Sequence, residues 1–360
     1  MESCLGALLP LLSRERAAGR AVALAVLTQT TGSTYQRPGA LLLIAANGEY
    51  AGLISGGCLE GDLAEQARAV IHSGEAREIV YDLRDPNDLV WGIGSGCEGA
   101  MRILLLRVGP QERWQPLAHL TESLASHSPT AIALVAASTD ERVALGSVAL
   151  PEEPTTHWLT EPARAALAAA SRAHEPSWFD LSARYRLFLL PLALPPRLLV
   201  LGAGPDAAPL ARLAGELRWK VTLADHRAAL AIPARFPTAE RVVETRPESL
   251  HAVVDLTAFD AAVIMTHQLE LDRAYLRVLA ESALPYIGLL GPPARAARLL
   301  AELGEQASML HGRLRAPVGL HLGGRSPEAI AVAIVAEILA FLNGRLPIAA
   351  PFAPIVPGAP

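Results

Sequence analysis

The chain has 360 residues, of which 51% are hydrophobic and 19% are charged, and its formal net charge is -5. This length is enough for two domains of ordinary size, and the acidic balance disfavours a surface that binds nucleic acid. No apolar run approaches a bilayer span, and the first residues do not form a signal peptide, so we expect no membrane association. Three cysteines do not make a disulfide framework, which favours a cytoplasmic location with reduced thiols.

The chain begins with short predicted elements separated by one polar loop. The pattern predicts a helix over 5–18 and strands over 21–27, 41–44 and 50–54. The loop over 28–38 is rich in hydroxyl groups. Its side chains include Ser33, Thr34 and Arg37, groups that bind a phosphate or a pterin-like heterocycle through hydrogen bonds. A solvated connection between strands is the simpler interpretation of this loop.

A glycine turn precedes the next predicted helix. Ser55, Gly56, Gly57 and Cys58 stand directly before a helical stripe of apolar residues, so Cys58 is expected near a helix N-terminus. That end of a helix stabilises a thiolate, which is the nucleophilic and metal-binding form of cysteine. Its free N–H groups also bind phosphate. The alternative is a small buried thiol in a tight turn.

Another cysteine lies in a second, denser glycine stretch. Residues 91–99 carry four glycines around Cys97, between strands predicted over 77–81 and 100–108. Glycines at this density allow a close approach of the backbone, so Gly96 and Cys97 are further candidates for a binding site. Two thiolates without a paired histidine fall short of a zinc site. The pattern still allows both thiols to face one cavity.

The rest of the first half completes one domain. Strands are predicted over 131–137, 143–148 and 186–190, and a helix is predicted over 161–173. We therefore expect a mixed α+β domain over 1–190, followed by a proline-rich linker over 191–196.

Strand, glycine turn and helix follow one another after this linker. A strand predicted over 197–201 runs into Gly202 and Gly204, of which the first suits a tight turn and the second leaves room for a phosphate. The next strand ends on Asp225, at the distance where a ribose hydroxyl acceptor belongs, and Arg227 could admit a 2′-phosphate. The pattern predicts a Rossmann-like, doubly wound parallel sheet over 197–345. The same turn also occurs in domains that bind no dinucleotide.

Further strands continue the predicted parallel sheet. They span 241–243, 261–265 and 285–291, and Thr266 and His267 follow the second of them. Ligands of open parallel sheets bind beyond the carboxyl ends of the strands, so His267 is placed for ligand contact or proton transfer. A structural hydrogen-bonding role is the alternative. A last helix ends near residue 344, and a Pro/Ala tail follows over 346–360.

These blocks together resemble the XdhC/CoxI family, the accessory factors of molybdenum hydroxylases such as xanthine dehydrogenase. The resemblance covers most of the chain and depends on many separate blocks in the right order. The blocks are 30–35, 37–40, 55–60, 94–99, 202–204, 209–210, 225–227, 265–267, 271–272, 286–291, 316–320 and 336–338. Two positions depart from the family's pattern. Gly291-Pro292-Pro293 stands where Gly-Ser followed by basic residues is usual, and His321 stands where an acid is common.

The resemblance implies an accessory protein or chaperone rather than an enzyme. Family members are thought to hold the molybdenum cofactor, protect it during sulfuration by a cysteine desulfurase, and deliver it to the apo molybdenum hydroxylase; a homodimer is expected. Molybdopterin carries a phosphate, a heterocycle and a soft metal, which suit glycine turns, hydroxyl groups and thiolates. The candidate cofactor-binding residues are Ser33, Thr34, Arg37, Ser55, Gly56, Gly57, Cys58, Gly96, Cys97, Gly202, Gly204, Asp225, Arg227, Thr266 and His267, with Cys58 and Cys97 as metal ligands.

Two other classes of function stay open. An NAD(P)-dependent oxidoreductase would use the Rossmann-like domain, with His267 as acid or base, but would leave the cysteine-bearing domain without a role. A binding module for the partner enzyme would hold no cofactor of its own. Stoichiometric NAD(P)(H) binding favours the first class, and a stable complex without any small molecule favours the second.

Overall fold

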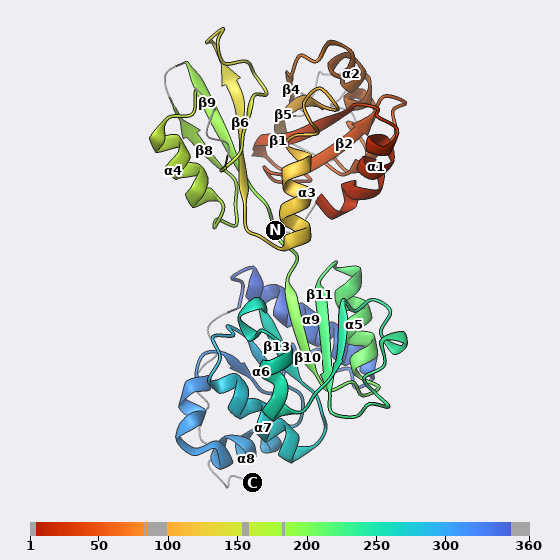
Figure 1. Ribbon diagram of the computed structural model, residues 1–360, viewed down its shortest axis with the longest axis vertical. Coiled ribbons are helices and arrows are strands. Elements are labelled where there is room, and N and C mark those ends of the chain that lie inside the picture. The colour runs from red at the N-terminus through yellow and green to blue at the C-terminus, as the bar shows by residue number, and fades with distance from the viewer. Residues whose placement is uncertain (1–4, 83, 85–98, 153–157, 182–183, 347–360) are drawn as a thin grey trace. The chain divides into compact units, whose positions relative to one another are not determined.

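The computed structural model describes residues 5–82, 84, 99–152, 158–181 and 184–346. The chain divides into two compact units, residues 1–194 and 195–360, and each has its own hydrophobic core (Figure 1). The predicted fold class is confirmed: a mixed α+β unit precedes a unit built on a doubly wound parallel sheet. Among the described helices, none combines the length and the apolar character needed to cross a bilayer.

Five antiparallel strands form the first sheet of unit 1, in the order β3-β2-β1-β5-β4. Alternate residues of a strand point to opposite faces. One face of this sheet packs against helix α2, and the other packs against helix α1 and the second sheet. The bounds are α1 (Leu5–Ala17), β1 (Val22–Gly32), β2 (Leu41–Ala45), β3 (Tyr50–Gly52), α2 (Glu60–Ser73), β4 (Arg77–Asp82) and β5 (Gly99–Val108).

Strand β1 extends through the first part of the predicted polar loop. Residues 28–32 continue the strand and, after a register shift, pair with β5 from Gln29 opposite Arg102 to Gly32 opposite Gly99. Main-chain hydrogen bonds to β5 hold this segment, so its polar side chains can stay partly exposed. The predicted loop is therefore wrong for residues 28–32. Strand β3 is shorter than the predicted 50–54, because the amide of Ile54 donates to Glu60 instead.

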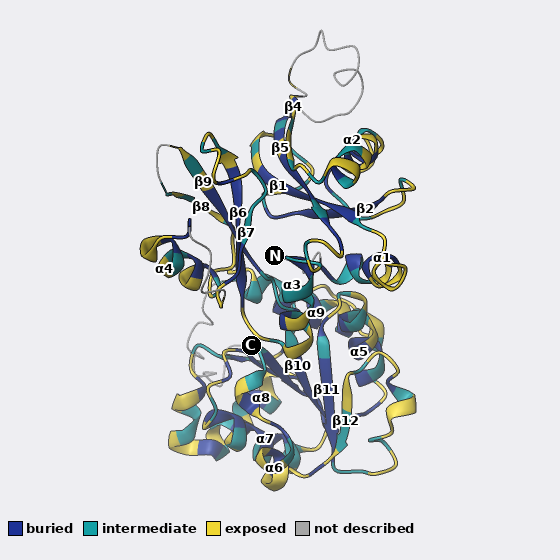
Figure 2. Ribbon diagram, turned by 45° about the horizontal axis from the view of Figure 1, so that its top comes forward, coloured by how far each residue is buried: buried dark blue, intermediate teal, exposed yellow. Residues whose placement is uncertain are grey.

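A second antiparallel sheet completes unit 1, in the order β7-β6-β9-β8. Helix α4 covers one face, and the other face packs on the first sheet; Figure 2 shows the buried strands and the exposed outer side of α4. The bounds are α3 (Leu117–Ser126), β6 (Ala131–Ser138), β7 (Val148–Ala149), α4 (Glu161–Ala170), β8 (Ser177–Asp180) and β9 (Tyr185–Pro191).

The strand predicted over 143–148 is wrong, because most of that segment forms turns. The amide of Val143 donates to the carbonyl of Asp140, and Gly146 has a φ of +77°, a left-handed conformation that interrupts a strand. Only the last residue of the segment, Val148, belongs to β7. Helix α3, between the two sheets in sequence, was not predicted.

Six parallel strands form the sheet of unit 2, in the order β12-β11-β10-β13-β14-β15. Helices α5 and α9 cover one face, and α6, α7 and α8 cover the other. The strands are β10 (Arg197–Leu201), β11 (Lys220–Asp225), β12 (Arg241–Glu244), β13 (Ala261–Ile264), β14 (Ile287–Leu289) and β15 (Leu314–Arg315). The helices are α5 (Ala207–Glu216), α6 (Leu250–Val253), α7 (Leu269–Ala280), α8 (Pro293–Leu303) and α9 (Pro327–Leu342), with short 3-10 turns at 233–235, 247–249, 256–258 and 304–310.

The order of the strands reverses between β10 and β13. The chain moves outward from β10 to β11 and β12, then returns to the other side of β10 as β13 and continues through β14. In open parallel sheets, the carboxyl ends of the two strands at such a switch point border the ligand crevice. The residues after β10 and after β13 are therefore the candidates for a site in unit 2.

Candidate functional site

The carboxylate of Glu60 organises the glycine turn that carries Cys58. It accepts hydrogen bonds from the amides of Ile54 (3.1 Å), Ser55 (2.9 Å) and Gly57 (3.0 Å), and from the Ser55 hydroxyl. The Ser55 hydroxyl oxygen in turn accepts the amide of Leu59 at 2.9 Å. Glu60 is 1% exposed. The turn is thus closed around one buried, fully hydrogen-bonded carboxylate.

These donors keep Glu60 ionised despite its burial. Burial alone raises the pKa of Glu60, since it removes the charge from water. The hydrogen bonds from the Ser55 hydroxyl and from the backbone amides outweigh that effect, and the pKa of Glu60 lies below its usual range. A fixed negative charge therefore lies beneath the turn.

Cys58 lies at the surface of this turn, and the buried-thiol alternative is wrong. Its side chain is exposed and forms no disulfide in the described structure, and the thiol donates to the carbonyl of Ser55 at 3.5 Å. Helix α2 begins two residues later, at Glu60, as the sequence predicted. No described residue accepts a hydrogen bond from the amides of Gly56 and Cys58. Within the described structure, an exposed thiol and two unpaired N–H groups are therefore presented together.

The hydroxyl-rich loop lies beside the same turn. A Cβ on Gly56 would stand 3.2 Å from the ring of Tyr35, which is 59% exposed. The hydroxyl of Thr34 donates to the carbonyl of Gln36 at 2.8 Å. Ser33 and Arg37 are exposed, and no side-chain partner of Arg37 occurs among the described residues. The structure thus brings the loop over 33–37 next to the turn over 55–58.

The second predicted cysteine site cannot be placed. Gly96 and Cys97 lie outside the described residues. Gly99, the first described residue after them, packs against the loop, since a Cβ there would stand 2.5 Å from the carbonyl oxygen of Ser33. The chain therefore reaches the loop two residues after Cys97.

In unit 2, the glycine turn connects β10 to α5 at the switch point. Gly202 has a φ of +117°, and a Cβ there would stand 2.6 Å from the carbonyl oxygen of Met265, directly after β13. At Gly204 the nearest heavy atom to such a Cβ would be a ring carbon of His267, at 4.0 Å. Gly202 is therefore required by close backbone packing, whereas Gly204 leaves open space above the turn.

Asp225 is turned inward and supports the glycine turn. It is 2% exposed, and it accepts the amide of Ala203 at 2.7 Å and the guanidinium of Arg227 at 2.7 and 2.9 Å. Burial raises the pKa of Asp225, but the Arg227 side chain and the backbone amides outweigh it and lower the pKa to about 2. Both carboxylate oxygens therefore already have partners within the protein.

Asp206 and His267 form a pair across the switch point. The His267 Nε2 lies 3.0 Å from the carboxylate of Asp206, which immediately precedes α5. His267 has a φ of +61°, a left-handed conformation that is uncommon outside glycine. Such conformations persist where surrounding structure enforces them, and they concentrate at functional sites. The pair lies where the topology places the ligand crevice.

Thr266 belongs to a buried network and does not point outward. Its hydroxyl donates to the carboxylate of Asp272, which is 0% exposed and also accepts two hydrogen bonds from Arg295, at 2.6 and 3.0 Å. This network fixes the loop that carries His267. Thr266 therefore supports the loop at the carboxyl edge of the sheet and lies next to His267, the candidate ligand contact.

Sequence reasoning did not select Glu60, Asp206, Asp272 or Arg295 as site residues. Two of them had a local signal, because an acid next to a helix N-terminus is favoured there, and Glu60 and Asp206 each follow a glycine pair by two or three residues. Arg295 reaches Asp272 across 23 positions of the chain. That contact exists only in the folded sheet.

Comparisons with known proteins cover both units. Residues 15–82 match a family model described as the XdhC and CoxI family, and residues 198–338 match the XdhC Rossmann domain. A protein of Bacillus subtilis (strain 168), described as a probable xanthine dehydrogenase subunit, is 33% identical over 317 residues, 88% of this chain and 92% of that protein. The molybdenum cofactor insertion chaperone PaoD of Escherichia coli (strain K12) is 24% identical over 324 residues, 89% and 83% of the two chains. A crystal structure of a xanthine dehydrogenase from Bacillus halodurans matches 96% of this chain and 98% of its own, with a TM-score of 0.74 and 28% identity.

Proposed function

We propose, because this chain belongs to the XdhC and CoxI family, that it is an accessory protein of a xanthine dehydrogenase-type molybdenum hydroxylase. It binds the molybdenum cofactor as cargo and supports the sulfuration of the cofactor and its insertion into the apo-hydroxylase. The observation that carries the proposal is the similarity to a molybdenum cofactor insertion chaperone over 89% of the chain. The partners are the apo-hydroxylase and a cysteine desulfurase, and the chain acts as a homodimer.

The turn around Cys58 supports this proposal chemically. The cargo combines a soft metal with a phosphate, and it would meet an exposed thiol and two amides without a described partner on one turn. A thiolate is the side chain that such a metal prefers, and amides at the start of a helix suit the phosphate. We assign Cys58 to the metal of the cargo, with Cys97 as its second thiolate.

The arrangement of ligating side chains fits a metal that arrives inside a cofactor. In the described part of the chain, no three His, Cys, Asp or Glu side chains are grouped so that they could hold a metal ion. A site built for a bare ion needs such a set. One or two thiolates are enough for a metal whose other ligands come with the cofactor.

The oxidoreductase alternative draws no support from the carboxyl edge of the parallel sheet. The ribose acceptor it requires, Asp225, already binds Ala203 and Arg227 through both oxygens. The carboxylate of Asp206 stands directly before α5, where the pyrophosphate of a dinucleotide would bring a like charge. We therefore propose that the residues at the carboxyl edge of the parallel sheet support the carrier function and take no part in hydride transfer.

The proposal is tested by reconstitution of an apo-hydroxylase. Purified protein loaded anaerobically with sulfurated molybdenum cofactor is mixed with the apo-enzyme, and substrate oxidation is followed against free cofactor. Faster or more complete activation by the loaded protein is expected, with Cys4→Ser equal to wild type and Cys58→Ser impaired. Activation no better than with free cofactor contradicts the proposal.

A further inference from the structure

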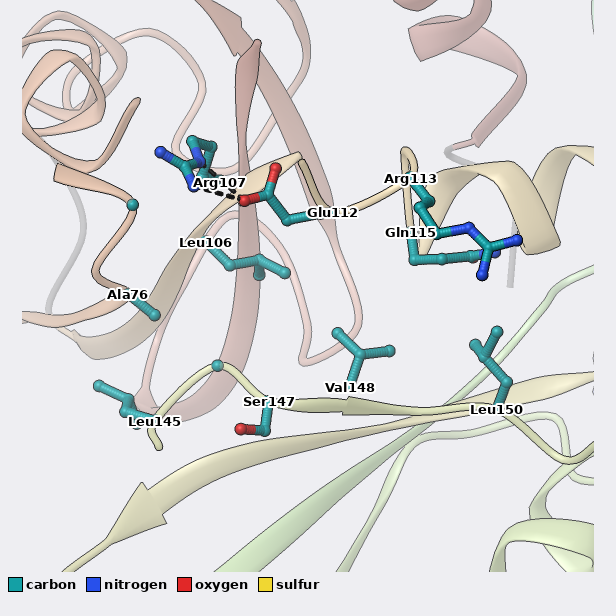
Figure 3. Close-up of a pocket in the computed structure, with 12 residues that line it drawn as sticks. Ala76, Leu106, Arg107, Glu112, Arg113, Gln115, Leu145, Ser147, Val148 and Leu150 are labelled. Atoms are coloured by element: carbon teal, nitrogen blue, oxygen red, sulfur yellow. Dashed lines mark hydrogen bonds and ion pairs between the residues drawn. The ribbon is translucent and has the colours of Figure 1, made fainter. Parts of the chain in front are cut away.

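Unit 1 contains a cavity of about 450 Å³ that none of the proposed cofactor-binding residues lines. Figure 3 shows it between the end of β5 with its following loop and the segment that leads into β7. Its volume is within the range of sites for small organic ligands. The lining residues are Gly74, Ala76, Leu106, Arg107, Glu112, Arg113, Gln115, Leu145, Gly146, Ser147, Val148 and Leu150.

One ion pair in the wall is internally neutral. The guanidinium of Arg107 donates to Glu112 Oε1 at 2.6 and 2.8 Å, and it also donates to the side chain of Gln111 at 2.5 Å. Arg107 and Glu112 are largely shielded, with side chains 18% and 28% exposed. The two charges offset each other, so this pair does not set the charge of the cavity.

Arg113 gives the cavity lining a net positive charge, since the charges of Arg107 and Glu112 offset each other. It is exposed, and no described residue pairs with its guanidinium. Its backbone is left-handed, with a φ of +52°, and the next residue, Trp114, has a φ of +63°. Two consecutive left-handed residues without glycine are unusual. The amide of Trp114 donates to the carbonyl of Gly109 at 2.8 Å, which holds the turn in this strained form.

One neutral donor, Gln115, lies beside this arginine (Figure 3). Gln115 Oε1 accepts the amide of His119 at 3.2 Å, which leaves the NH₂ group of Gln115 free to donate. The hydroxyl of Ser147 lies at the other end of the lining and points away from Arg113 (Figure 3). The opposite part of the lining is apolar and consists of the side chains of Ala76, Leu106, Leu145, Val148 and Leu150.

We propose that this cavity binds a small organic anion: a carboxylate or phosphate group on an apolar or aromatic body. Arg113 neutralises the oxyanion, and Gln115, whose side chain lies beside it in Figure 3, donates a hydrogen bond to it. The body packs against the aliphatic wall. The proposal is independent of the carrier function, because it uses none of the residues assigned to the molybdenum cofactor.

Methyl NMR of the full chain provides a test localised to the cavity. Protein labelled at leucine and valine methyls is titrated with benzoate, phenyl phosphate, benzyl alcohol and inorganic phosphate. Probes of this size are expected to bind with a Kd on the order of 1 to 10 mM. We expect saturable shifts of the Leu145, Val148 and Leu150 methyls with both aromatic anions, and at least about tenfold weaker binding of benzyl alcohol and inorganic phosphate.

Variants connect the shifts to the assigned residues. Arg113→Gln should weaken benzoate binding about tenfold, whereas Arg172→Gln, at an exposed arginine outside the cavity, should not change it. Val148→Phe, at a side chain that points into the cavity (Figure 3), fills it and should abolish the shifts of the Leu145 and Leu150 methyls. Unchanged methyl signals of Leu42 and Leu63, in the part of the unit 1 core that packs against α2, check that each variant is folded. No saturable shift with either anion, or equal binding by wild type and Arg113→Gln, overturns the proposal.

Discussion

The carboxylate of Glu60 accepts the amide of Gly57 at 3.0 Å and so ties the first turn of α2 back to the residue before Cys58. Three further donors converge on the same carboxylate, from Ile54 and Ser55. The exposed thiol is therefore mounted on a rigid turn rather than on a free loop. Preorganisation of this kind lowers the entropic cost of binding a cargo.

Replacement of Glu60 by glutamine should loosen this turn. The amide NH₂ of the glutamine would face backbone N–H donors, so at least one donor loses its acceptor and unfolding becomes easier by about 1 to 3 kcal/mol. Urea unfolding measures this loss, and retention of molybdenum cofactor should fall with it. Glu65→Gln, on the exposed side of the same helix, is the control and should change neither quantity.

The two glycines after β10 should respond differently to alanine. At Gly202 a methyl group would meet the Met265 carbonyl oxygen and the φ of +117° would be strained, so we expect a loss of about 2 to 4 kcal/mol. At Gly204 the space is open, and the loss should stay below about 1 kcal/mol. Urea unfolding of the two variants checks the difference. Equal losses would contradict the packing described here.

Asp225 should make the stability of unit 2 depend on acid pH. Its pKa is about 2 in the folded state and about 3.9 in an unfolded chain. A lowered pKa stabilises the fold fully above the unfolded value, and this contribution, about 2 to 3 kcal/mol, is lost as the pH falls from about 4 to 2. Urea midpoints between pH 2 and pH 6 measure it, followed by the tryptophan fluorescence of the chain, to which unit 2 contributes Trp219.

The variant Asp225→Asn isolates this residue from other acids. It should be less stable than wild type at pH 6 and nearly equal to it at pH 2, because protonated Asp225 has lost the same charge. Glu216→Gln, at an exposed carboxylate of α5 with no partner among the described residues, should follow the wild-type profile. If the stability of Asp225→Asn depends on pH as steeply as that of wild type, the charge of Asp225 contributes nothing to the stability.

The left-handed backbone conformation of His267 should lower the stability of the folded chain. Glycine adopts a φ of +61° without strain, so His267→Gly is expected to raise the free energy of unfolding by up to about 1 kcal/mol. If the side chain serves the cargo, the same variant should retain less molybdenum cofactor. Arg218→Gly is a matched control, since Arg218 also has a φ of +61° but belongs to no candidate site. Equal cofactor retention by both variants removes His267 from the site.

The strand–turn–helix core of unit 2 was predictable because its signals are local. A buried strand, two glycines and an amphipathic helix stand in order between residues 197 and 217, and the parallel sheet follows from that unit. The turn before α2 was predictable for the same reason. Its organising residue, Glu60, was missed, because four donors from residues 54–57 converge on it only after the chain has closed.

Other errors arose where pairing between distant segments decides the structure. Polar residues 28–32 are strand because β5 supplies their hydrogen-bonding partners, although their composition is typical of a loop. Residues 143–147 lie outside the strand although Gly146 and Ser147 exchange hydrogen bonds with Val135 of β6, because the left-handed Gly146 interrupts the extended backbone before Val148. The Asp225 carboxylate points into the protein because it accepts hydrogen bonds from Arg227 and from the amide of Ala203, 22 positions away. Sequence spacing alone places such a carboxylate but not its partners.

The most direct test of the carrier function is an anaerobic titration with molybdenum cofactor. Molybdenum and oxidised pterin fluorescence are read after gel filtration for wild type, the Cys58→Ser/Cys97→Ser double variant, and Cys4→Ser as the control. The account predicts retention near one molybdenum per chain by wild type and by the control, and its loss in the double variant. No retention by wild type, or equal retention by the double variant, would contradict it.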